Sequence, residues 1–227
     1  AGRKSGVRKW TANSVNPMLN HVTAMLAGLE KQGVIARNVA ALVDRVPLDQ
    51  KDMKTFTEDE VRRLLAHVEG KRIGHAWHLA LSGLRRGEIA GLRWADIDFG
   101  AGTLTIRHNR VSVNGRATEG APKSRRSTRT LPLTEALTAA LKRARKRQAV
   151  ERLRVGAAYE QGGYVVCDAV GRPCHPDSLS KWWPGVCASA GVSPIRLHDA
   201  RHTCGTLMHL QGVPIVVISA WLGHADA

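Results

Sequence analysis

Most of this chain carries the spacing of amphipathic helices, and one short segment interrupts that spacing. Over residues 15–29 and 61–68, apolar side chains recur every three or four positions, which predicts helices with one buried face. Within residues 104–133 the pattern changes to alternation, which predicts short strands, and Asn114-Gly115 is typical of a hairpin turn. The sequence therefore predicts a mixed α+β fold that is mainly α-helical, with a small three-stranded antiparallel sheet.

Local signals predict where several of these elements begin. Thr57 and Glu60 have the spacing of a capping box, which predicts that a helix begins there. Ser193-Pro194 predicts another helix start, with proline at the first helical position. Pro132 cannot donate to a neighbouring strand, so we expect it at a sheet edge. The strands are expected at residues 104–106, 111–113 and 130–133.

The chain is strongly basic. It contains 34 lysines and arginines against 19 acidic residues, which gives a formal net charge of +15. Such an excess repels itself in a compact fold and indicates a polyanionic partner, with nucleic acid ahead of an anionic membrane surface. We expect no membrane association, because no apolar run approaches the length of a bilayer span. The basic stretch from Lys142 to Arg154 either lies on phosphates or forms a solvated face, and the solvated face is favoured.

Metal and cofactor motifs are not apparent in the sequence, so we expect no cofactor. Four cysteines, none in a C-x-x-C pair, predict buried reduced thiols in an intracellular protein rather than a zinc site. Gly115 and Gly120 with Lys123 have a weak likeness to a phosphate-binding loop, but the lysine is displaced and no helix follows. Paired carboxylates suited to two-metal chemistry are also absent.

The densest group of cations lies at residues 195–224. His198 and Arg201 stand three residues apart, so on a helix they share one face and can grip one small anion together. We expect this pair to be buried without a carboxylate partner, which implies that the anion comes from a ligand, most simply a phosphate. Taken alone, each has an equally good structural explanation, and so do Arg85, Lys123 and His224.

Taken together, four segments closely resemble the tyrosine recombinase (phage integrase) family. SGLRRGEIAGLRWADID is similar to its first arginine box, and PKSRRSTRTLPL to the β-hairpin that delivers a catalytic lysine. LHDARHT is similar to its H-x-x-R box, and WLGH to the box of the final histidine. The resemblance implies a catalytic set of Arg85, Lys123, His198, Arg201 and His224, supported by Glu88.

The resemblance also implies two domains. Residues 1–50 are similar to the C-terminal part of the family's helical core-binding domain with a linker, and residues 51–227 to its catalytic domain. The family's nucleophilic tyrosine follows the L-G-H box, whereas Tyr159 and Tyr164 precede it and are interpreted as structural. We therefore expect the nucleophile beyond Ala227, and we expect this chain alone to be inactive in cleavage.

The function that the resemblance implies is that of a site-specific recombinase. Such an enzyme cleaves and rejoins double-stranded DNA recombination sites through a 3′-phosphotyrosyl intermediate, for integration or excision of a phage or other mobile element. A homotetramer on DNA, accessory DNA-bending proteins and a cytoplasmic location in a bacterial host are implied with it. Three alternatives remain: a non-catalytic DNA-binding protein of the same fold, a type IB topoisomerase, and an RNA-binding or ribosome-associated basic protein.

Overall fold

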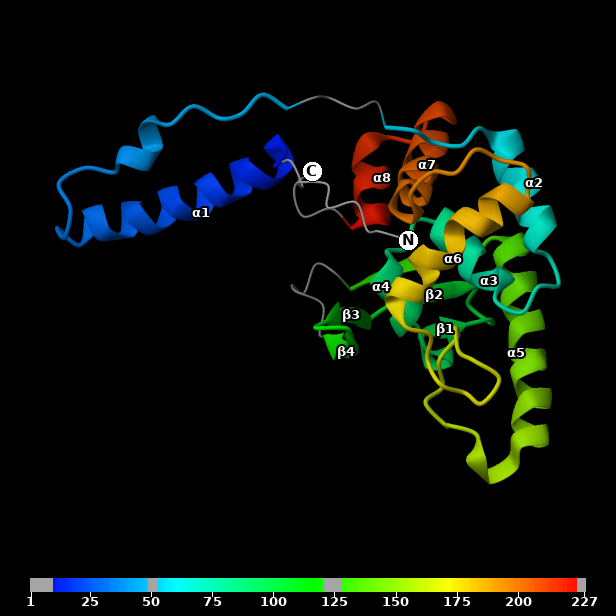
Figure 1. The fold of residues 1–227 in the computed structure, drawn as a ribbon. Coiled ribbons are helices and arrows are strands. Elements are labelled where there is room, and N and C mark those ends of the chain that lie inside the picture. Colours follow the sequence, from blue (N-terminus) through cyan, green and yellow to red (C-terminus); the bar gives the residue numbers. More distant parts are fainter. Residues whose placement is uncertain (1–9, 49–52, 121–127, 224–227) are drawn as a thin grey trace, which may run out of the picture. The chain divides into compact units, whose positions relative to one another are not determined.

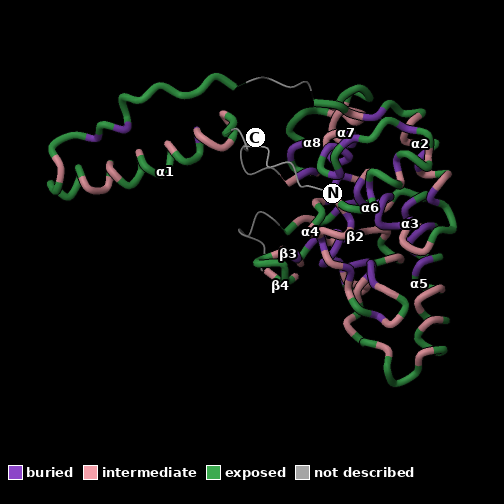
Figure 2. Tube along the Cα trace, viewed as in Figure 1, coloured by how far each residue is buried: buried purple, intermediate pink, exposed green. Residues whose placement is uncertain are grey.

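The computed structural model describes residues 10–48, 53–120 and 128–223. The chain divides into two compact units, Ala1–Asp52 and Met53–Ala227 (Figure 1). Nearly all of the buried residues belong to the second unit (Figure 2). In the described ranges, no helix combines the length and the apolar character needed to cross a membrane.

The first unit consists of one long helix and a returning segment. Helix α1 (Ala12–Lys31) is followed by a 3-10 helix at Val39–Leu42. The Asn16 side chain donates to the carbonyl of Val46 at 2.9 Å and accepts from its N–H at 3.0 Å. These two hydrogen bonds hold Val46 against the first turns of α1, and the helical part of the returning segment ends at Leu42.

The second unit is a helical domain around a core of aromatic and aliphatic side chains. Trp77 and Trp183 are almost fully buried, and their ring centroids lie 5.4 Å apart. The Trp183 indole N–H donates to the carbonyl of Ile195 at 2.8 Å, so its polar edge is satisfied inside the core. The helices are α2 (Glu58–Val68), α3 (Gly74–Leu81), α4 (Arg86–Gly91), α5 (Glu135–Val155), α6 (Pro176–Ser189), α7 (Leu197–Leu210) and α8 (Ile215–Leu222).

Two of these helices test the predicted starts. The capping box of Thr57 and Glu60 is confirmed, because each residue accepts the backbone N–H of the other. The start at Pro194 is wrong, because α7 begins at Leu197. There the carboxylate of Asp199 accepts the N–H of Arg196 and so fixes Arg196 as the residue that precedes the helix.

The strands form two small antiparallel sheets. One contains β1 (Ile97–Asp98), β2 (Thr103–Ile106) and β5 (Arg129–Pro132) in the order β1-β2-β5. The other is a hairpin of β3 (Asn109–Val113) and β4 (Arg116–Gly120).

The predicted sheet has the right number of strands, but one of the three predicted strands is wrong. The strand expected at residues 111–113 belongs to the separate hairpin, and β1 takes its place. Pro132 lies on β5 at the sheet edge, as predicted. The hairpin turn is also confirmed, since Asn114 (φ 50°) and Gly115 (φ 76°) both have the positive φ that this turn requires.

The four cysteines are free and buried, as expected. Burial raises the pKa of Cys174, Cys187 and Cys204 to about 11, so these thiols stay protonated at neutral pH. In the parts of the chain that the structure describes, no group of three or more His, Cys, Asp or Glu side chains is arranged to hold a metal ion.

Candidate functional site

Arg201 is the most deeply buried charged residue of the described chain. It lies on α7 and is 2% exposed. Its Nη1 donates to the carbonyl of Gly83 at 2.6 Å, and its Nη2 donates to the carbonyl of Leu222. These carbonyls follow α3 and end α8, so Arg201 ties both segments to α7. Carbonyl oxygens satisfy its hydrogen bonds but do not neutralise its charge.

Glu88 is the buried carboxylate around which two further arginines gather. Arg85, just before α4, donates from Nη1 to Glu88 at 2.9 Å and from Nη2 to the carbonyl of Gly223 at 2.7 Å. Arg129 on β5 donates from both terminal nitrogens to the two Glu88 oxygens, each at 2.9 Å. Burial alone would raise the pKa of Glu88, but the hydrogen bonds and charge of Arg129 and the contacts of Arg85 outweigh it and lower that pKa.

The arginine cluster, defined as Arg85, Arg129 and Arg201, holds three positive charges against the single negative charge of Glu88. Burial, with the nearby charges of Arg85 and Arg129, lowers the pKa of Arg201 to about 9, which leaves it protonated at neutral pH. The Arg85 side chain is 38% exposed, while those of Arg129 and Glu88 are 7% and 6% exposed. The cluster therefore carries an excess of positive charge that solvent reaches through Arg85, which suits an anionic ligand.

His198 lies one turn before Arg201 on α7, but it is not buried. Its side chain is exposed, and its ring meets the edge of His202 with centroids 4.8 Å apart. Partial burial of the ring, with the charges of His202 and Arg201, lowers its pKa. The predicted burial is thus wrong for His198 and confirmed for Arg201. The neighbouring carboxylate of Asp199 pairs with Arg196, not with Arg201.

Lys123 and His224 lie outside the described residues, so their roles remain predictions. Their neighbours are described: Gly120 ends β4 and Arg129 begins β5. Gly223, which precedes His224, caps α8 with φ +64° and contacts the Arg129 side chain. The structure thus brings Arg85, Glu88 and Arg201 together and places His198 on the same helix as Arg201.

Arg129 is the member of the cluster that sequence reasoning missed. It lies inside the PKSRRSTRTLPL segment, one residue before the expected strand at 130–133, and its partner Glu88 is 41 residues away. One signal was present: Arg129 and Leu131 point to the same face of β5 because side chains alternate along a strand. Since Leu131 is a core residue, a charge on that face needs a buried partner.

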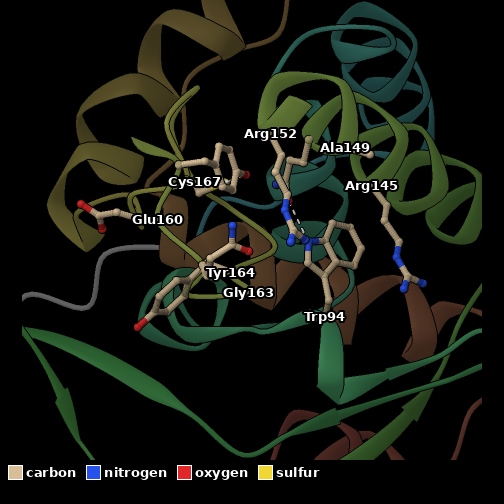
Figure 3. A pocket seen from close by; sticks show the side chains of 12 residues that line it. Trp94, Arg145, Ala149, Arg152, Glu160, Gly163, Tyr164 and Cys167 are labelled. Carbon is tan, nitrogen blue, oxygen red and sulfur yellow. Dashed lines mark hydrogen bonds between the residues drawn. The ribbon is translucent and has the colours of Figure 1, made fainter. Parts of the chain in front are cut away.

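A separate cavity of about 360 Å³ lies between α5 and residues 159–171 (Figure 3). Trp94 forms part of its wall and donates to the Gln148 side chain at 2.7 Å. None of the described residues of the predicted catalytic set lines it. The residues around it are Trp94, Arg145, Gln148, Ala149, Arg152, Tyr159, Glu160, Gln161, Gly163, Tyr164, Cys167 and Gly171.

The basic stretch on α5 has several structural contacts. Arg147 donates to the carbonyls of Gly70, Lys71 and Arg72, which follow the end of α2. The Arg145 guanidinium lies 5.9 Å from the Trp94 ring centroid. Part of this stretch therefore serves the fold, although Lys146, Arg152 and Arg154 are exposed.

The two tyrosines have neighbours of their own, away from the arginine cluster. The Arg93 and Arg110 guanidiniums lie 4.9 and 5.4 Å from the Tyr164 ring centroid, and the Tyr164 hydroxyl donates to Glu119. Burial raises the pKa of Tyr159 to about 12. The interpretation of both residues as structural stays a prediction.

A mainly helical domain with small antiparallel sheets is also found among known proteins. The model of the Phage integrase family matches residues 54–227. A "tyrosine recombinase XerC-like" protein of Caldanaerobacter subterraneus subsp. tengcongensis is 32% identical over 190 residues, which are 78% of this chain and 49% of that protein. The ICEBs1 integrase of Bacillus subtilis is 25% identical over 94% of this chain and 58% of its own length. The chain thus spans about half the length of the curated relatives it matches.

Solved structures share the fold. The Tn1549 transposon integrase in complex with transposon right end DNA superposes with a TM-score of 0.81 at 18% identity, over 96% of this chain and 73% of that chain. A lambda integrase dimer bound to a core site gives a TM-score of 0.59 at 16% identity, over 97% of this chain and 63% of that chain. The chain belongs to the phage integrase family of tyrosine recombinases. The predicted family and the predicted fold class are both confirmed.

Proposed function

We propose that this chain carries the phosphate-activating site of a site-specific DNA recombinase. The enzyme would cleave and rejoin DNA through a 3′-phosphotyrosyl intermediate, for integration or excision of a mobile element. The observation that carries the proposal is the arginine cluster. Its three positive charges are only partly neutralised by the single negative charge of Glu88. In this proposal Met53–Ala227 belongs to the catalytic domain, and Ala1–Asp52 to a helical core-binding domain.

Arg85 and Arg201 would bind the non-bridging oxygens of the scissile phosphate. Each terminal guanidinium nitrogen carries two hydrogens, so a contact to Glu88 or to a carbonyl leaves further donors for a phosphate. Charge on those oxygens grows during attack, and donors that are already fixed stabilise it without reorganisation. The contacts of Arg201 to two backbone carbonyls are the kind of fixation that this requires.

The proton transfers are assigned to residues beside the cluster. The tyrosine oxygen attacks phosphorus while His198 helps accept its proton, and Lys123 protonates the departing 5′ oxygen. The lowered pKa of His198 suits a proton acceptor, because the ring is neutral at pH 7. His224 would donate a further hydrogen bond to the phosphate. The covalent link conserves the energy of the broken bond, so rejoining needs no external energy source.

Double-stranded DNA is the proposed partner. The net charge of +15 suits neutralisation of backbone phosphates, and solved structures of the same fold include integrases in complex with DNA. We propose that the complete protein acts as a homotetramer on paired recombination sites, with accessory DNA-bending proteins, in the cytoplasm of a bacterial host.

The test uses the complete native protein and a duplex selected from a randomised library by binding alone, here called the selected duplex. The wild-type protein is expected to form a covalent adduct with it, and the adduct should map to a tyrosine. Arg201→Lys should reduce adduct formation by about 1,000-fold with duplex affinity retained, because a lysine cannot replace a bidentate fork. The exposed Arg196, on the same helix end, gives the matched control Arg196→Lys.

The alternatives give different results in the same assay. A non-catalytic DNA-binding protein would bind the selected duplex without forming any adduct. A type IB topoisomerase would relax a supercoiled plasmid that carries one site, whereas a recombinase joins DNA between two sites. An RNA-binding protein would prefer RNA to the selected duplex and would be unaffected by Arg201→Lys.

A further inference from the structure

Arg129 joins three segments that are distant in the sequence. From β5, its terminal nitrogens reach both oxygens of Glu88 on α4, each at 2.9 Å. Its Nε donates to the carbonyl of Trp221 in α8 at 2.7 Å. All three guanidinium nitrogens are therefore in use in a side chain that is 7% exposed. Arg129 is thus placed to act through its neighbours rather than on a ligand of its own.

Arg129 also lies against the backbone of Gly223. That residue has φ +64°, and a Cβ added there would lie 3.1 Å from Cδ and from Nη1 of Arg129. The carbonyl of Gly223 accepts from Arg85 at 2.7 Å. Arg129 consequently binds the Glu88 carboxylate and lies next to Gly223, and these are the two partners of the Arg85 guanidinium.

We propose that Arg129 is a positioning residue of the phosphate site, which fixes the two partners of Arg85 and thereby sets the direction of its guanidinium. The inference rests on the proposed function of Arg85. Without Arg129, the Glu88 oxygens would keep only their contacts to the N–H and Nη1 of Arg85, and the carboxylate could take the Arg85 guanidinium as a bidentate partner. That pairing would draw the guanidinium towards the carboxylate and away from the phosphate.

Among the described residues on the elements that pack against α4, no other cation is placed to replace Arg129 as a partner of Glu88. Arg129 and Arg85 act most strongly on the charge of Glu88, and Glu88 in turn acts on Arg201. On the neighbouring α6, Asp177 pairs with Arg86 at 2.9 Å. On β3, which also packs against α4, Arg110 donates to the carbonyl of Cys174. Loss of Arg129 would therefore leave Glu88 with one close guanidinium.

The chain offers a matched control for the loss of a bidentate ion pair. Arg72 donates to both oxygens of Glu151, at 3.1 and 2.8 Å, and to the carbonyl of Cys167. This arrangement has the same donor set as Arg129 but contains no member of the arginine cluster. Arg72→Gln therefore reports what the loss of such a fork does to folding, separately from its effect on the phosphate site.

The experiment compares Arg129→Gln, Arg129→Lys and Arg72→Gln in the complete native protein with the selected duplex. We expect Arg129→Gln to slow single-turnover adduct formation by about 100-fold, the loss typical of a misplaced catalytic group, with duplex Kd changed by less than about threefold. Arg129→Lys should lose about 10-fold, because it keeps the charge but not the fork. Arg72→Gln should lower the thermal midpoint yet keep the rate within about threefold of wild type.

A pH profile separates positioning from a merely structural role. Ionised Glu88 is needed to hold Arg85, so the rate should fall as pH drops through the Glu88 pKa. Because Arg129 lowers that pKa, Arg129→Gln should move the acid limb to higher pH, and Arg72→Gln should not.

The outcomes are distinguishable. No adduct from the wild-type protein would overturn the proposed function and this inference with it. A normal wild-type rate with equal losses in Arg129→Gln and Arg72→Gln, or an acid limb that does not move, would overturn only the positioning role.

Discussion

Helices α4 and α7 begin with the same arrangement of arginine and acid. The N–H of Arg85 donates to Glu88 at 2.8 Å, and the N–H of Arg196 donates to Asp199 at 3.2 Å. In both cases the arginine side chain pairs with the same carboxylate, at 2.9 Å in α4 and 2.7 Å in α7. An arginine followed by an acid three residues later is therefore, by itself, a device for starting a helix.

The difference lies in what else reaches the carboxylate. Glu88 is shared with Arg129, whereas Asp199 accepts both side-chain contacts from Arg196 alone. The Arg196 side chain is 77% exposed, against 38% for Arg85. Sharing the carboxylate leaves Arg85 incompletely neutralised next to the buried Arg201. The same sequence pattern is thus a helix cap in one place and part of a candidate phosphate site in the other.

The largest expected difference between the two helix starts is in catalysis. Arg85→Ala in the complete protein should slow adduct formation by about 1,000-fold, because it removes a donor to the developing phosphate charge. Arg196→Ala should change the rate by less than about threefold, since its charge is mostly solvated. Single-turnover kinetics on the selected duplex measure both. Equal losses would mean that the exposed Arg196 also contacts the phosphate.

Removing the negative charge of Glu88 should lower the free energy of unfolding more than removing that of Asp199. Glu88→Gln leaves Arg129 buried without its counter-charge and should cost about 3 kcal/mol of unfolding free energy. Asp199→Asn keeps a hydrogen-bond acceptor and frees an exposed arginine, so the expected cost is about 1 kcal/mol. Urea unfolding gives both values. A larger loss for Asp199→Asn would contradict the ranking drawn from burial.

Acid titration should detect the contribution of both carboxylates to stability. Hydrogen bonds from Arg196 lower the pKa of Asp199, and those of Arg129 lower the pKa of Glu88 despite its burial. A lowered folded-state pKa contributes stability above the unfolded-state value of about 4, and this is lost as pH falls through the folded value. Stability measured between pH 6 and pH 2 should therefore depend less on pH in Glu88→Gln and in Asp199→Asn than in the wild-type protein. A pH dependence that is unchanged in either variant would contradict the lowered pKa of that acid.

The smallest expected difference in stability is between Gly223, which lies beside the arginine cluster, and a glycine away from it. Gly223→Ala forces a side chain into φ +64° and against Arg129, and should cost about 2 kcal/mol. Gly191, after α6, has φ +67° and open space around it, so Gly191→Ala should cost about 1 kcal/mol. Thermal unfolding compares them. If the two variants are equally stable, the Arg129 side chain moves aside at little cost in free energy.

The accuracy of the sequence-based predictions followed the range of the interactions concerned. Thr57 with Glu60 and Asn114 with Gly115 were read correctly, because each pair is fixed by residues within one turn. The start of α7 was placed too early because Pro194 suggested a helix start, while the hydrogen bond from Arg196 to Asp199 decided it.

Strand partners and the arginine cluster depend on distant residues. β1 consists of two residues, too few for alternation to be seen, yet it completes the sheet. Arg85, Glu88 and Arg201 were named from the family boxes, but their contacts across α4, α7 and α8 could not be read from spacing. Arg129 belonged to one of those boxes and was still missed, since its partner lies on another element.

The burial of the four cysteines makes site-specific fluorescent labelling of the chain possible. With thiols protonated and shielded inside the fold, the four cysteines of this chain should react little with maleimide reagents at neutral pH. A cysteine introduced on the surface, for example Arg62→Cys on α2, would then carry a single fluorophore without removal of the natural four. Fluorescence anisotropy of that fluorophore would follow duplex binding by this chain.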